Sequence, residues 1–137
     1  MIVGGIEVEI QGYPYQLSFE YGGSHICGAS IYSANYAVSA AHCVVGSSAR
    51  NIRFRAGSTN RGSGGSLHQA DTVVYHGSYN DRTTDYDVSV ARVNTPFPIG
   101  SSGVKAIPLA TSEPTSGNSI VSGWGTTSVS IILLQNF

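Results

Sequence analysis

The stretch "SAAHC", residues 39–43, places His42 directly before a cysteine at the end of a short apolar run. An imidazole accepts a hydroxyl proton efficiently when a carboxylate holds its other nitrogen in the correct tautomer. The later stretch "TTDYDVSV" offers two carboxylates, Asp85 and Asp87. Asp87 directly precedes the alternating Val88 and Val90, whereas Asp85 lies in a polar turn. His42 could thus be a general base that one of these carboxylates orients, or it could be a packed core histidine, and the residues by themselves leave both readings open.

The other histidines, His25, His68 and His76, stand in no recognisable motif, and we expect them at the surface or in turns. A nucleophile for the base is harder to find. Ser63 lies between glycines in "RGSGGS", but no aspartate precedes it, and a Gly/Ser-rich hairpin tip explains that stretch better. Ser39 lies beside the base and is expected to be structural. The sequence therefore contains a candidate base and carboxylate but no candidate nucleophile.

The two cysteines, Cys27 and Cys43, have no CxxC spacing and no His-rich neighbourhood, so we expect no zinc site. They form either one disulfide or two buried thiols. A bridge closing a loop of about 15 residues would stabilise the fold by about 3 kcal/mol. It would need an oxidising compartment, yet the opening "MIVGG" has no secretory signal. This mismatch predicts that the sequence is part of a longer product.

The composition limits the class of protein. Of the 137 residues, 41% are hydrophobic and only 11% are charged, and 17 are glycine. This is enough apolar material for a buried core, with many turns between short elements. The net charge of −1 and the lack of a basic block argue against nucleic acid or anionic membrane as partners. No apolar run approaches the 18 residues or so that a membrane span needs.

Short apolar runs bounded by Gly, Asn, Asp or Ser recur along the chain, without a convincing helical period. Six such runs predict an all-β barrel or sandwich with antiparallel strands. The Pro-containing stretch "NTPFPIGSSG" then reads as a connector. The predicted strands cover residues 15–19, 25–31, 36–40, 52–56, 70–75 and 88–93.

Four motifs occur in one order: "IVGG" (2–5), "SAAHC" (39–43), "DVSVARV" (87–93) and "VSGWGTT" (121–127). Together they resemble the trypsin/chymotrypsin family of serine endopeptidases over residues 2 to about 128. The small number of cysteines is similar to that of arthropod digestive trypsins. "SAAHC" with an upstream cysteine is a specific signal, whereas "IVGG" or "GWG" alone would be weak.

The resemblance implies the first antiparallel six-stranded β-barrel of a trypsin-like two-barrel fold, plus the first strand of the second barrel. Residues 2–110 would form the first barrel, and residues 111–128 the incomplete start of the second. After the motifs, residues 129–137 leave the family pattern abruptly. Since Val129 and Ser130 can be encoded by an intron start, we hypothesise that this tail is translated intron; a divergent strand is the alternative.

The resemblance also assigns roles to individual residues. His42 would be the base, Asp87 its carboxylate, and Cys27–Cys43 the disulfide beside the base. The family's nucleophile lies in a Gly-Asp-Ser-Gly-Gly motif that these 137 residues lack. In the family, the amino group freed before "IVGG" pairs with the aspartate of that motif.

In this chain Met1 precedes the activation segment of Ile2 and Val3, and the aspartate that would receive the amino group is missing with its motif. We therefore expect the chain as written to be catalytically incompetent.

The resemblance thus predicts a trypsin-like endopeptidase that hydrolyses peptide bonds by acyl transfer, secreted, and without a cofactor. Its partners would be peptide or protein substrates and protease inhibitors. The alternative is a non-catalytic protease homologue that binds partners or acts as a decoy. We expect no metal site, because the stretch matching the family's calcium loop offers a carboxylate only at Asp71.

Overall fold

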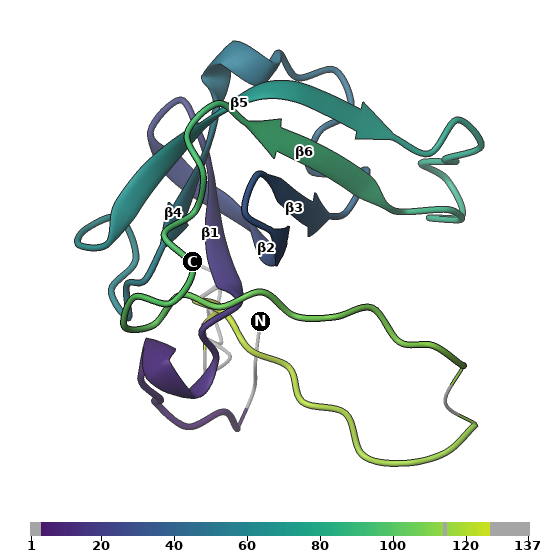
Figure 1. Ribbon diagram of the computed structural model, residues 1–137. Coiled ribbons are helices and arrows are strands. Elements are labelled where there is room, and N and C mark those ends of the chain that lie inside the picture. The colour runs from purple at the N-terminus through teal and green to yellow at the C-terminus, as the bar shows by residue number, and fades with distance from the viewer. Residues whose placement is uncertain (1–3, 114, 127–137) are drawn as a thin grey trace, which may run out of the picture.

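A computed structural model describes residues 4–113 and 115–126 of the chain. Its centre is a closed β-barrel in which the strands follow the order β1-β2-β3-β6-β5-β4, every neighbouring pair antiparallel (Figure 1). The predicted all-β, six-stranded barrel is therefore confirmed. The strands are β1 (Gln16–Tyr21), β2 (Ser24–Ser33), β3 (Tyr36–Ser39), β4 (Ile52–Ala56), β5 (Ser66–Tyr75) and β6 (Ser89–Val93).

The strand predictions hold best where apolar and polar residues alternate. β4 spans residues 52–56 as expected, with its buried positions alternating with half-buried arginines. β5 begins at Ser66, four residues before the predicted start at Ala70. The prediction missed the first half of this strand because that half carries polar residues on its inward face.

His68, on that polar half of β5, corrects a sequence prediction: it is 3% exposed rather than at the surface. Its Nε2 lies 2.7 Å from the Ser66 hydroxyl and its Nδ1 lies 2.9 Å from the carbonyl oxygen of Thr95. These contacts satisfy both ring nitrogens, so the ring packs against Phe97 at a low cost in buried polarity.

Large side chains from facing strands fill the barrel. Phe19 and Phe54 are fully buried, with ring centroids 5.1 Å apart. In β6 the inward residues are Ser89, Ala91 and Val93, whereas Val90 faces outward and is 41% exposed. Small side chains on the inner face of β6 leave room for the aromatic rings of the opposite strands.

A buried ion pair lies within the barrel wall. Glu20 is 1% exposed, and its Oε1 accepts a hydrogen bond of 2.7 Å from Nε of Arg55. The Arg53 guanidinium lies 4.0 Å from the other carboxylate oxygen, Oε2. Arg55 also donates to the carbonyl oxygen of Gly64 in the β4–β5 hairpin. The charge on Glu20 is therefore compensated mainly by Arg55.

After β6 the chain crosses the barrel and then leaves it. Lys105 N–H donates to Pro14 and Ile107 N–H to Ile31 before a long excursion away from the strands, drawn in green and yellow in Figure 1. Trp124 ends that excursion by donating its indole N–H to the carbonyl oxygen of Thr59. In the described part of residues 111–128 no strand forms, and no strand of the barrel lies free to pair with it.

The helices among the described residues are single 3-10 turns, η1 (Ile10–Gly12) and η2 (Ala49–Asn51). Neither has the length or apolar character to cross a bilayer.

We predict that Arg55→Met lowers the free energy of unfolding by about 3 kcal/mol, because it leaves the Glu20 carboxylate buried without its main partner. Arg92→Met is the matched control: the Arg92–Asp71 pair is exposed on both sides, so its loss should lower the free energy of unfolding much less than Arg55→Met does. Urea unfolding of both variants measures the difference. Equal losses would show that the Glu20 carboxylate does not depend on Arg55.

Candidate active site

The barrel brings His42 and Asp87 together through the pairing of two strands. β3 ends at Ser39 and β6 begins at Ser89, and these two residues are register partners in an antiparallel pair. The residues that follow β3 therefore emerge next to those that precede β6. His42 lies three residues past the end of β3, and Asp87 two residues before the start of β6, so both lie at the same edge of the sheet.

Asp87 contacts His42 with both carboxylate oxygens. Oδ2 lies 2.7 Å from the ring Nδ1, and Oδ1 accepts the backbone N–H of residue 42 at 2.8 Å. The side-chain hydrogen bond from His42, followed by the backbone one, lowers the pKa of Asp87 below its usual value. A carboxylate only accepts hydrogen bonds, so Nδ1 carries the proton and the neutral ring keeps its lone pair on Nε2.

The imidazole is accessible, while its carboxylate is more sheltered. The His42 side chain is 56% exposed and that of Asp87 is 22% exposed. The structure thus brings the two residues predicted from the sequence into direct contact.

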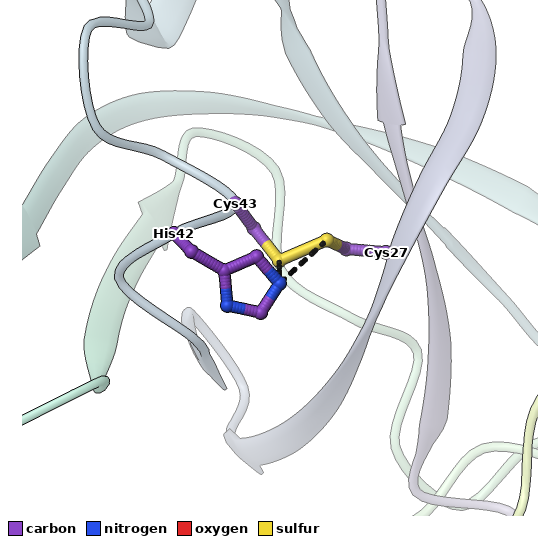
Figure 2. A group of neighbouring side chains, drawn as sticks. All are labelled: Cys27, His42 and Cys43. Atoms are coloured by element: carbon purple, nitrogen blue, oxygen red, sulfur yellow. Dashed lines mark hydrogen bonds between the residues drawn. A yellow bond between two sulfur atoms is a disulfide. The ribbon is translucent and has the colours of Figure 1, made fainter. Parts of the chain in front are cut away.

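The two cysteines form the predicted disulfide, which ties β2 to the residue after His42. Figure 2 shows the His42 ring lying against this bridge, with Nε2 3.4 Å from Cys43 Sγ and 4.0 Å from Cys27 Sγ. The three residues place metal-ligand atom types close together. In the disulfide, however, neither sulfur is a thiolate, which is the form that binds metals.

Two serine hydroxyls hold the segment that carries His42. Ser39 donates to the carbonyl oxygen of Gly28, and Ser89 donates to that of Ala40, each at 2.8 Å. Ser39 therefore has a structural contact, as expected. Ser89, which is 3% exposed, was not predicted from the sequence. The feature that could have identified it is a polar residue at an inward position of an apolar strand.

The turn that delivers Asp87 is strained. Thr84 and Tyr86 have φ angles of 57° and 55°, a region that side chains with a Cβ rarely adopt. Stacking between Tyr86 and His76, with ring centroids 4.6 Å apart and planes 11° from parallel, helps to hold this turn. The exposed Asp85 accepts a hydrogen bond from Thr83 within the turn. The choice of Asp87 over Asp85 as the partner of His42 thus agrees with the structure.

The remaining candidates lie elsewhere. Ser63 is exposed in the hairpin between β4 and β5, where its backbone carbonyl accepts the Ser58 hydroxyl. His25 is half-buried on β2, with Nδ1 2.7 Å from the Ser18 hydroxyl and its ring edge-on to Trp124. Ile2, Val3 and the tail at 129–137 lie outside the described residues.

The site thus consists of a closed six-stranded barrel with a His–Asp pair at its edge, next to a disulfide. The sequence model of the trypsin family matches residues 2–135, so the chain belongs to the trypsin family. Trypsin alpha of Drosophila melanogaster is 46% identical over 128 residues, 93% of this chain and 50% of that protein. Trypsin epsilon of Drosophila erecta is 42% identical over 127 residues, 92% of this chain and 49% of that protein.

Among solved structures, a scabies mite inactivated protease paralogue superposes with a TM-score of 0.86 at 28% identity. The match covers 93% of this chain and 55% of that one. The chain therefore spans about half the length of the curated relatives that it matches.

We predict that His42→Ala raises the pKa of Asp87 toward its ordinary value of 3.8, with a remainder of the lowering kept by the backbone N–H of residue 42. In the native chain the stabilisation from this contact is complete above pH 4 or so. It is lost as the pH falls through the lowered folded-state pKa. A carboxyl-detected NMR titration measures the pKa of Asp87 in the native chain and in the variant.

The pKa of Asp71, which the hydrogen bond from Arg92 lowers, is the internal reference and should not move in His42→Ala. An unchanged Asp87 titration in the variant would contradict the contact between the two side chains.

Proposed function

We propose that this chain supplies the general-base half of the active site of a trypsin-like serine endopeptidase. The observation that carries the proposal is the two-point contact of the Asp87 carboxylate on His42, through ring and backbone. The reaction class is peptide-bond hydrolysis by acyl transfer, a mechanism for which this family is itself the reference case. The substrates are peptides or proteins, and protease inhibitors bind the same surface.

In this proposal each atom of the pair has a defined task. Nε2 of His42 takes the proton from a serine hydroxyl as that oxygen attacks the carbonyl carbon. The resulting imidazolium is stabilised by the Asp87 carboxylate at Nδ1 and then gives the proton to the leaving amine. No cofactor takes part in these steps.

The isolated 137-residue chain is proposed to be inactive toward peptide bonds. Its sequence has no Gly-Asp-Ser-Gly-Gly motif, and Ser63 lies on a different hairpin from His42. Without a nucleophile and the donors of an oxyanion hole, a base alone supplies only a small part of the catalysis. Secretion is part of the proposal and is supported by the disulfide, which persists in oxidising compartments.

A second candidate is a non-catalytic homologue that binds substrates or inhibitors as a decoy. One observation favours it: the solved structure reported above is that of an inactivated protease paralogue. The contact between Asp87 and His42 favours the enzyme, because a binding protein has no need of a tautomer fixed for proton transfer.

We predict that a phosphonate probe directed at activated serines, applied to extract of the natural source, labels a protein that contains peptides of this sequence and is longer than 137 residues. The isolated chain should not be labelled. When that longer protein is expressed, His42→Ala should reduce the rate of labelling by a factor of at least about 10⁴.

Asp85→Asn is the matched control, because Asp85 lies two residues from Asp87 and bonds only within its own turn; labelling should persist. A short secreted form that is never labelled would support the decoy and overturn the enzyme.

A further inference from the structure

The second nitrogen of the His42 ring faces the disulfide, and the proposed hydrolytic function gives that contact no role. Nδ1 is occupied by Asp87, so Nε2 is the only nitrogen of the ring that can exchange a proton. It lies closer to Cys43 Sγ, at 3.4 Å, than to Cys27 Sγ, at 4.0 Å (Figure 2). An imidazolium N–H at that position points its charge at the Cys43 sulfur.

The two cysteine residues differ in their exposure to solvent. Cys43 is 7% exposed and belongs to the core cluster, whereas Cys27 is only partly buried on β2. A thiolate from solution therefore reaches Cys27 more readily, and Cys43 becomes the leaving group. The buried leaving sulfur is also the one nearer to the imidazole, so accessibility and proton supply favour the same direction of attack.

We propose that Cys27, Cys43 and His42 form a thiol–disulfide exchange centre whose substrates are low-molecular-weight thiols of the glutathione class. An incoming thiolate attacks Cys27 Sγ and forms a mixed disulfide, while the bond to Cys43 breaks and its electron pair remains on Cys43 Sγ. The His42 imidazolium stabilises that thiolate or protonates it from Nε2. A second thiolate then attacks the sulfur of the bound thiol, which releases the oxidised small disulfide and the Cys27 thiolate.

The exchange consumes two thiols, reduces one protein disulfide and forms one small-molecule disulfide. It uses no serine, and it is independent of the proposed peptidase function. Asp87 is a positioning residue here: it holds the ring and stabilises its charged form through Nδ1. In the reduced chain, Cys43, His42 and Asp87 then form a row in which a thiolate adjoins an imidazolium, the arrangement that activates cysteine nucleophiles.

The test measures reduction of the isolated oxidised chain by glutathione at neutral pH, with acid quenching, thiol alkylation and mass spectrometry. His42→Ala should slow the first exchange step about tenfold, because the leaving sulfur loses its proton donor. Asp87→Asn should also slow it. Arg92→Met removes an exposed side chain that pairs with Asp71 and does not contact the disulfide, and this variant should react at the native rate.

The position of the trapped mixed disulfide is the second readout. Glutathione should be found on Cys27, with Cys43 alkylated. Rates within twofold of the native chain for both His42→Ala and Asp87→Asn would overturn the proposal, and so would glutathione on Cys43. If His42→Ala does not fold, the exchange rate of Asp87→Asn, which keeps the shape of the side chain, is the deciding measurement. If neither variant folds, the deciding measurement is which cysteine of the native chain carries glutathione in the trapped mixed disulfide.

Discussion

The antiparallel pairing of β3 with β6 is the constraint on which the rest of the site depends. It sets Ser39 opposite Ser89. His42, which follows β3, is thereby brought next to Asp87, which precedes β6. Asp87 then binds both the ring and the backbone of His42, which fixes the position of the histidine and its tautomer together. A slip of the register by one residue would invert which side chains face the core.

Most polar groups in the barrel interior have specific hydrogen-bond partners; among the described residues, Glu20 Oε2 is a buried side-chain oxygen that accepts no hydrogen bond. Glu20 is held by Arg55, His68 by Ser66 and the Thr95 carbonyl, and Ser89 by the carbonyl of Ala40. The last of these contacts joins the start of β6 directly to the segment carrying His42. Interior polar pairing and site geometry are therefore parts of one arrangement.

One imidazole can serve two kinds of chemistry here. Its Nδ1 is held by Asp87, and its Nε2 lies between solvent and the Cys27–Cys43 bridge. As a base toward an incoming hydroxyl it supports the proposed peptidase; as an acid toward Cys43 it supports thiol exchange. The base role needs a bare Nε2 and the acid role needs a proton there, but in both the Asp87 carboxylate holds the proton on Nδ1, so both depend on the Asp87 contact.

Sequence reasoning found the elements whose signal is local. The alternation in residues 52–56 predicted β4, and the family motifs identified His42, Asp87 and the disulfide. It failed where burial is decided by distant partners. β1 is buried over five successive residues, and the last of these, Glu20, can be buried because Arg55 from the neighbouring strand β4 binds its carboxylate.

His68 and the strained Tyr86 were missed for the same reason. Their partners, Thr95 and His76, are set by the closed barrel and by a turn that no short motif records.

Asp87 fixes the tautomer of His42, and a ¹H–¹⁵N NMR spectrum of the histidine side chains measures that tautomer. With neutral His42, we expect a proton on Nδ1 and a bare Nε2, and we expect Asp87→Asn to abolish this pattern. A proton on Nε2 in the native chain, or the same spectrum in the native chain and the variant, would contradict it.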